Sequence, residues 1–115
     1  MKKALYFLTL STCFIHLISA CAKPTEACFD FSPTESISTT TALTFDASCT
    51  KYGGTSYNWN FGDGTPDTTV MGYPMITHTF NTSGTYTVTL EAKRKDRPVL
   101  FPNNKYLTKR TVVVQ

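Results

Sequence analysis

The amino-acid sequence predicts an all-β protein, an antiparallel β-sandwich of about seven short strands that follows a signal peptide. Three observations predict this fold. Apolar and polar residues alternate with a period of two along most of the chain. Stretches rich in Gly, Pro, Asn, Asp, Ser and Thr interrupt the alternation at regular intervals. No amphipathic helix pattern occurs, so each alternating run is expected to bury one face in a shared core.

Residues 1–20 are predicted to be a secretory signal peptide. Lys2 and Lys3 give a positive start, and Ala4–Ala20 is an apolar run of 17 residues that contains no acid. A membrane-spanning helix is the alternative interpretation. A run of this length is at the short limit for a span, and no cluster of Lys and Arg follows it. The pattern therefore favours a segment that is removed.

The stretch Ile18–Cys21, with sequence ISAC, resembles the lipobox of bacterial lipoproteins. This resemblance implies that Cys21 is acylated and becomes the first residue of a membrane-anchored protein, with residues 21–27 as a short polar tether. Ordinary cleavage after Ala20 is the alternative. Because Ala22 rather than an acid follows the cysteine, lipoprotein sorting rules imply an outer membrane location that faces the periplasm.

The mature chain, residues 21–115, is close to neutral. It keeps 9 basic and 8 acidic residues, because only two lysines leave with the signal. A nucleic-acid-binding protein is not expected, since it would need a strongly basic face. The length allows one domain with a modest core.

Six stretches have the alternation of half-buried strands. They are CFDFS (28–32), ALTFDAS (42–48), SYNWNFG (56–62), MITHTF (75–80), GTYTVTLEA (84–92) and YLTKRTVVVQ (106–115). The fifth stretch is the clearest example, because Val88, Leu90 and Ala92 are separated by Thr and Glu. Threonine is typical of the solvated face of a strand.

Three motifs in order resemble the PKD domain, the polycystic-kidney-disease module with an immunoglobulin-like β-sandwich. The matching residues are Tyr57, Trp59, Phe61, Gly62, Asp63 and Gly64, then His78, Thr79 and Phe80, and then Gly84, Tyr86, Val88 and Leu90. The resemblance extends over residues 28–115 and departs from the family at Asn60, where Asp is usual. It implies a non-catalytic module for protein or carbohydrate contacts.

Two aromatic residues of these motifs have predicted roles. Trp59 lies on a central predicted strand and is expected to fill the space between the two sheets. Tyr86 follows Gly84 at the start of a strand, as in a tyrosine corner. Its hydroxyl is therefore expected to bond to the backbone within Phe80–Ser83.

Gly62-Asp63-Gly64 is predicted to be a turn that ends a strand. The glycines permit positive φ, and the aspartate carboxylate can accept N–H groups of its own turn. The alternative is a calcium site formed by Asn58, Asn60, Asp63 and Asp67. Calcium requires six to eight oxygen ligands, and this turn offers too few. No metal or other cofactor is predicted.

Cys28 and Cys49 are predicted to form a disulfide, because the other cysteines lie in the signal and at the lipid site. Two buried thiols are the alternative. If Phe31 pairs with Phe45, then Cys28 faces Ser48, and Cys49 is one residue out of register. The bridge therefore requires a bulge or a strand end at this point.

His78 is predicted to be a partly buried, hydrogen-bonded residue rather than a catalyst. It shares a strand face with Ile76 and Phe80, and no nucleophile motif accompanies it. Enzymatic activity is therefore not expected.

The candidate contact surface combines basic and apolar residues. The basic residues are Lys93, Arg94, Lys95 and Arg97, and the apolar ones are Tyr73, Met75 and Phe101. The basic run suits anionic lipid or an acidic polymer, although a solvated loop that protects a strand edge is the simpler interpretation. The apolar residues either mark contacts or pack as small satellite cores.

The function expected from these features is a protein-interaction or adhesion module tethered to a membrane. The alternatives are a carbohydrate-binding accessory module of a glycan-processing system and a spacer without a ligand. A buried Trp59 cannot serve as a glycan platform, and packed-down loops at Tyr73 and Phe101 would favour the spacer. Asp67-Thr68-Thr69 also resembles a bacterial O-glycosylation motif.

Overall fold

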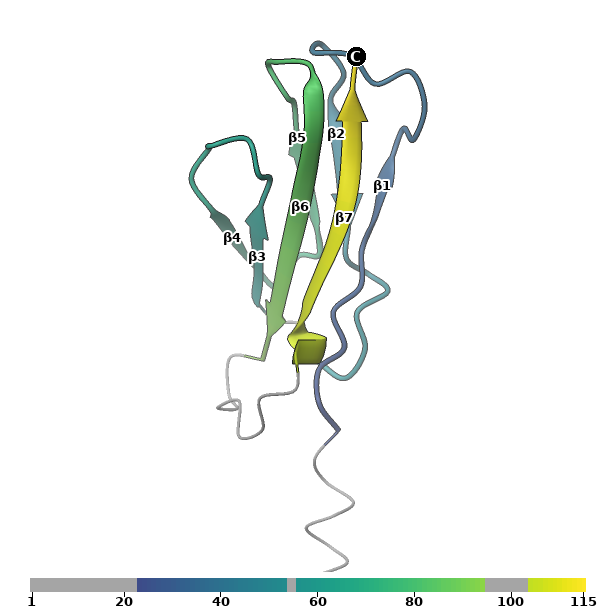
Figure 1. The fold of residues 1–115 in the computed structure, drawn as a ribbon. Helices are drawn as coiled ribbons and strands as arrows, with labels where there is room; N and C mark the ends of the chain where they lie inside the picture. The colour runs from purple at the N-terminus through teal and green to yellow at the C-terminus, as the bar shows by residue number, and fades with distance from the viewer. Residues whose placement is uncertain (1–22, 54–55, 95–103) are drawn as a thin grey trace, which may run out of the picture.

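A computed structural model describes residues 23–53, 56–94 and 104–115, which form two packed antiparallel sheets (Figure 1). The strands are β1 (Asp30–Ser32), β2 (Leu43–Asp46), β3 (Ser56–Asn60), β4 (Thr68–Met71), β5 (Met75–His78), β6 (Gly84–Lys93) and β7 (Leu107–Val114), and the 3-10 helix η1 is Asn104–Tyr106. The predicted signal peptide and Cys21 lie outside the described residues. Within the described ranges, no helix is long and apolar enough to cross a bilayer.

The two sheets have the orders β1-β2-β5 and β4-β3-β6-β7. All strand pairs are antiparallel, and the longest pairing joins β6 to β7. The predicted register between the first two strands is confirmed, since Phe31 lies opposite Phe45. The all-β sandwich prediction is therefore confirmed.

One strand departs from the sequence prediction. No strand is predicted between residues 62 and 75, but Thr68–Met71 forms β4, whereas β5 begins at Met75 as predicted. β4 is an edge strand, and most of its residues are exposed, so no apolar alternation marks it. Only Val70 is partly buried against the core.

An aromatic cluster fills the space between the sheets. Trp59 is fully buried and meets Phe29 edge-on, with ring centroids 5.2 Å apart. Phe45 contacts Trp59 and Phe61 from the opposite sheet, at 5.9 and 5.3 Å. The buried apolar residues are Phe29, Ile37, Leu43, Phe45, Ala47, Tyr57, Trp59, Phe61, Phe80, Val88, Leu90, Ala92, Val112 and Val114. The inward faces predicted for β3 and β6 are thus confirmed.

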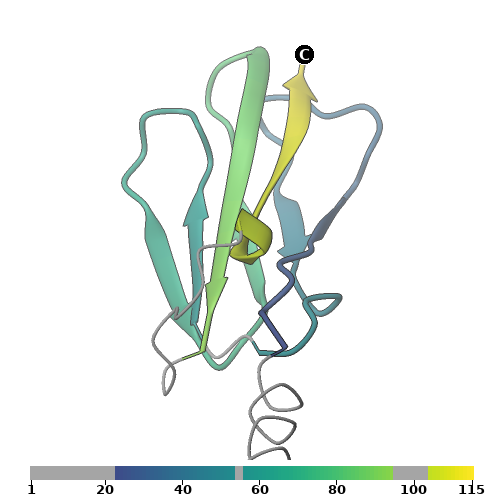
Figure 2. The same cartoon turned by 60° about the horizontal axis from the view of Figure 1, so that its bottom comes forward.

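The described chain enters the sandwich at one end, which we call the entry end. Glu26 forms a β-bridge with Lys51, and the Ala27 amide donates to the Lys105 carbonyl at 2.7 Å. Residues 25–27 of the predicted tether are therefore bonded to the folded domain. The opposite end, which we call the far end, holds the C-terminus, where the Gln115 amide donates to the Ile37 carbonyl (Figures 1 and 2).

Candidate functional site

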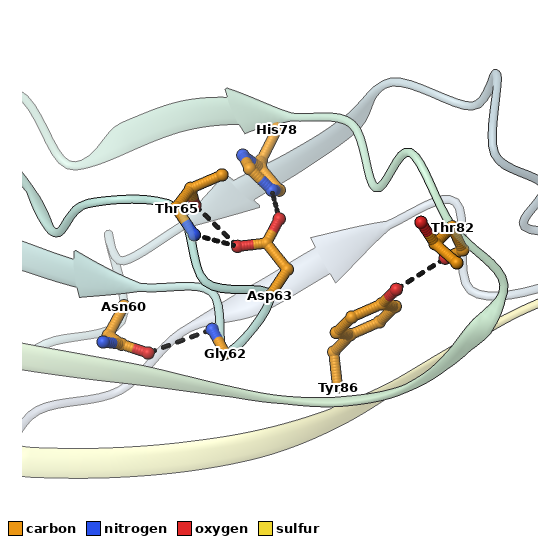
Figure 3. Close-up of polar contacts among 7 residues, drawn as sticks. All are labelled: Asn60, Gly62, Asp63, Thr65, His78, Thr82 and Tyr86. Atoms are coloured by element: carbon orange, nitrogen blue, oxygen red, sulfur yellow. Dashed lines mark hydrogen bonds and ion pairs between the residues drawn. The ribbon is translucent and has the colours of Figure 1, made fainter.

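The Gly62–Gly64 corner ends β3 at the far end, as predicted. Gly62 and Gly64 have φ values of 72° and 84°. The Gly62 amide donates to the Asn60 side-chain oxygen at 2.9 Å (Figure 3). A Cβ atom on Gly62 would lie 2.5 Å from the Thr87 carbonyl oxygen, so the corner requires glycine for space as well as for φ.

Asp63 organises this corner. Its Oδ1 accepts hydrogen bonds from the Thr65 amide at 3.1 Å and the Thr65 hydroxyl at 2.6 Å, while its Oδ2 lies 2.7 Å from His78 Nε2 (Figure 3). Burial acts to raise the pKa of Asp63, but the bonds from Thr65 and His78 outweigh it and hold the pKa below its ordinary value. The predicted acceptance of the turn's own N–H group is confirmed.

His78 is held on its remaining sides by aromatic rings. Its imidazole stacks on Phe61 with centroids 3.8 Å apart, and it meets Phe80 edge-on at 4.8 Å. Its side chain is 15% exposed, so the prediction of a partly buried, hydrogen-bonded histidine is confirmed. The sequence did not predict that Asp63 is the partner of His78. Because His78 lies on β5 and Asp63 follows β3, the pair joins the two sheets.

The carboxylate–imidazole pair does not form a catalytic triad with the described residues. A nucleophile would need to lie within hydrogen-bond reach of the imidazole. In the described part of the chain, the neighbouring hydroxyl of Thr65 bonds to the carboxylate instead. The Asp63–His78 pair, which we call the clasp, therefore has a structural role and joins the two sheets.

The tyrosine corner has the predicted geometry. Tyr86 Oη donates to the Thr82 carbonyl at 2.6 Å, within the expected segment (Figure 3). The Tyr86 ring stacks on Phe80 with centroids 4.3 Å apart. The bond fixes the turn between β5 and β6 beside the Gly62–Gly64 corner.

Three of the four residues weighed for calcium, Asn58, Asn60 and Asp67, form a hydrogen-bonded ladder with Thr69 on the outward face beside β3 and β4. Asn60 donates to Asp67 at 2.6 Å, and Thr69 donates to Asn58 at 3.0 Å. Both carboxylate oxygens of Asp63 are occupied by Thr65 and His78. Within the described ranges, no group of three or more His, Cys, Asp or Glu side chains lies close enough to hold a metal ion.

The Cys28–Cys49 disulfide is present, with the two Cα atoms 5.3 Å apart. β1 begins at Asp30 and β2 ends at Asp46, so both cysteines lie beyond the paired strands. This is the strand-end geometry that the register requires. The bridge lies at the entry end, directly after the hydrogen-bonded residues 25–27.

The candidate contact residues are only partly described. Tyr73 is 59% exposed and donates to the Met75 sulfur at 3.7 Å. Lys93 pairs with Glu91 at 2.6 Å, and Arg94 follows it. Lys95, Arg97 and Phe101 lie outside the described residues. Met75 also lines a shallow hollow of about 200 Å³ on the outward face of β1 and β2, which is smaller than a typical small-molecule pocket.

Together, the aromatic core, the clasp and the tyrosine corner define an immunoglobulin-like β-sandwich module. The PKD domain family matches residues 24–97, so the chain belongs to this family. Human (Homo sapiens) Polycystin-1 is 50% identical over 34 residues, which cover 30% of this chain and 1% of Polycystin-1.

A solved structure from work on the promiscuous specificity of carbohydrate-binding modules of the β-sandwich superfamily is also similar. It superposes with a TM-score of 0.65 and 27% identity, over 80% of this chain and 34% of that chain. PKD domains and β-sandwich binding modules are non-catalytic folds. Fold and family therefore support a non-catalytic adhesion or binding module.

Proposed function

We propose that this protein is an interaction module held on the periplasmic face of a bacterial outer membrane through lipidated Cys21, where it binds an envelope protein. The observation that carries the choice of a protein partner is the burial of Trp59 between the sheets. A glycan-binding face commonly needs exposed aromatic rings, and this ring is closed off on both sides by the core.

The outward face of the four-stranded sheet also supports a protein partner. In the described strands, this face presents short polar side chains rather than aromatic rings. They include Ser56, Asn58, Asn60, Thr85, Thr87, Thr89 and Thr111. Such a surface offers hydrogen-bond donors and acceptors to another polypeptide and gives no stacking platform for sugar rings.

The connection of the chain to the domain supports a fixed presentation. Because residues 25–27 are bonded to the entry end, only a few residues separate Cys21 from the sandwich. A lipid on Cys21 would hold the entry end near the membrane and leave the far end free for a partner. The exposure of Tyr73 argues against a spacer whose loops are packed down.

The test is site-specific photocrosslinking in living cells. A photoreactive amino acid replaces Thr87 on the outward sheet face or Glu35 near the far end, both of which are exposed. We expect one dominant crosslinked protein, which is lost in the Cys21→Ser variant because the module is no longer anchored. Capture of no protein above the unirradiated background at either position would overturn the proposal.

Carbohydrate binding is the second candidate, favoured by the similarity to carbohydrate-binding modules. Tyr52 and Tyr73 are the exposed aromatic rings among the described residues. If they form a sugar site, the Tyr73→Ala variant should lose about two- to twelvefold in oligosaccharide affinity, as expected for one stacked ring worth about 0.5–1.5 kcal/mol. Isothermal titration of a panel of oligosaccharides measures this, and no binding by the parent protein would remove this candidate.

A further inference from the structure

The exposed large apolar residues of the described chain gather at the entry end. Tyr52 directly follows Lys51, which forms the bridge with Glu26. Tyr73 precedes Pro74, whose carbonyl accepts a hydrogen bond from the Ala47 amide. Leu107 follows η1. Met71 also lies there, since it pairs with Ser56, which pairs with Lys93 at the end of β6. Four such residues thus share one end, whereas Val113 lies away from it.

Positive charge gathers at the same end. Among the described residues, the cations of the entry end are Lys23, Lys51, Lys93, Arg94 and Lys105. The described acids there are Glu26 and Glu91, each paired with a lysine, Asp46, which accepts hydrogen bonds from Ser48, and Asp30, which lies opposite Asp46 and forms an ion pair with Arg110. With Arg110, which reaches Asp30 from β7, six positive charges of the described residues therefore face four negative ones.

The far end has the opposite character. Glu35 lies in the connection between β1 and β2, whose Ile37 bonds to Gln115, and Asp63 and Asp67 lie in the turn between β3 and β4. Neither segment contains a lysine or arginine. The molecule is therefore polarised along its long axis, with a basic and apolar entry end and an acidic far end.

Aromatic and basic side chains are also in contact at the entry end. The Lys23 ammonium lies 5.0 Å from the centre of the Tyr52 ring, and Tyr52 is 46% exposed. Tyrosine and lysine combine an apolar body with a polar tip, which is the composition that suits the boundary between water and lipid headgroups.

We propose that the entry end docks on the anionic bilayer surface that holds the anchor, so that the sandwich stands upright on the membrane. This inference rests on the proposed lipidation of Cys21. Cys21 lies three positions before Pro24, and an extended chain of that length spans at most about 10 Å. The basic and apolar side chains of the entry end therefore lie within reach of the headgroups, and the acidic far end points away from them.

The test uses the lipidated protein, labelled with nitrogen-15 and placed in bilayer discs of phosphatidylethanolamine and phosphatidylglycerol with a nitroxide on some lipid headgroups. We expect amide signals of Tyr52, Tyr73 and Leu107 to be broadened more than those of Gly64, Ser83 and Val114. Uniform broadening, or stronger broadening at the far end, would overturn the inference.

A mass measurement separates the two proposals. If the isolated protein lacks the acyl groups, the anchored module itself fails, because Cys21 is not the lipid site. If the acyl groups are present and the broadening shows no preference for the entry end, only the docking inference fails.

A matched pair of charge reversals tests the electrostatic part. Lys51→Glu removes a cation from the entry end, whereas Lys109→Glu makes the same change on the outward face of β7, where Lys109 pairs with Thr89. Since a lysine near an anionic surface contributes on the order of 1 kcal/mol, we expect Lys51→Glu to lower the ratio of docked to free orientations at least about fivefold. Equal effects of the two variants, or no loss in discs of neutral phosphatidylcholine, would overturn it.

Discussion

At the scale of single residues, Asp63 connects the turn after β3 to the opposite sheet. One carboxylate oxygen holds Thr65 of its own turn and the other holds His78 on β5. The imidazole is in turn stacked on Phe61, the last aromatic residue of the β3 segment. The corner is therefore stabilised from within the turn and from across the core.

Replacing Asp63 with Asn should destabilise the fold by about 1–3 kcal/mol at neutral pH, because a charge-assisted bond to a largely buried partner is lost. Urea unfolding followed by circular dichroism measures the difference. Asp67→Asn is the control, because Asp67 is exposed, and it should cost less than about 1 kcal/mol. Equal losses in the two variants would contradict a special role for Asp63.

The stabilisation by Asp63 should depend on pH. Folding lowers the pKa of Asp63 below its ordinary value of 3.8, so its ionised form stabilises the folded state above that pH. This contribution is lost as the pH falls through the lower pKa of the folded state. The stability difference between the parent and Asp63→Asn should therefore shrink as the pH falls below 3.8.

Substitutions at Gly62 and Gly64 distinguish the cost of backbone strain from the cost of a steric clash. Alanine at Gly62 and at Gly64 meets similar positive φ values, but only at Gly62 would the new Cβ approach a backbone oxygen, that of Thr87. We expect Gly64→Ala to cost about 1 kcal/mol and Gly62→Ala to cost at least about 1 kcal/mol more. Thermal unfolding of both variants gives the comparison, and equal losses would mean that the backbone shifts to admit the methyl group.

At the scale of elements, the strands that bury an alternating face could be predicted from the sequence. β3 and β6 place one residue in two against the core, and their predicted inward residues are buried. β4 could not be predicted, because an edge strand with a mostly exposed surface carries no apolar period. Its position depends on pairing with β3, a tertiary contact that local sequence does not encode.

The Gly62–Gly64 corner also shows that local sequence predicts local contacts but not tertiary ones. The positive φ values and the self-capped turn at Asp63 follow from local chemistry and were predictable. The bond to His78 was not, because it joins a loop to a strand 15 residues away in the opposite sheet. Alternation with a period of two indicates on which face of the sheet a residue lies, but it does not indicate which loop packs against that residue.

The disulfide joins the entry segment to the turn after β2 over a sequence separation of 21 residues. A loop of that length should contribute roughly 3 kcal/mol, mainly by restricting the unfolded chain. We expect the Cys28→Ala/Cys49→Ala double variant to lose about 2–4 kcal/mol in urea unfolding. Reducing agent should destabilise the parent by a similar amount and leave the double variant unchanged.

At the scale of the whole molecule, the order of pairing determines how the chain must fold. β3 pairs with β6, which lies beyond two intervening strands, and β2 pairs with β5. Such non-local pairing brings distant segments together before stabilising contacts form, so folding is slow.

We therefore expect refolding of the oxidised protein to take milliseconds to seconds, as in other sandwiches of this size. Stopped-flow circular dichroism after dilution from urea measures the rate. The disulfide-free double variant should refold more slowly, because its longer free loop must close first. Completion within microseconds would contradict the expected dominance of non-local contacts.

The burial of Trp59 gives the protein an internal optical probe. It is the only tryptophan in the chain, it is fully buried, and its indole N–H has no hydrogen-bond partner among the described residues. An indole in such apolar surroundings emits at shorter wavelength than one in water. Intrinsic fluorescence should therefore shift to the red when the sheets separate, yet remain constant when a partner or a bilayer covers the surface, so that loss of structure and binding can be distinguished without any added dye.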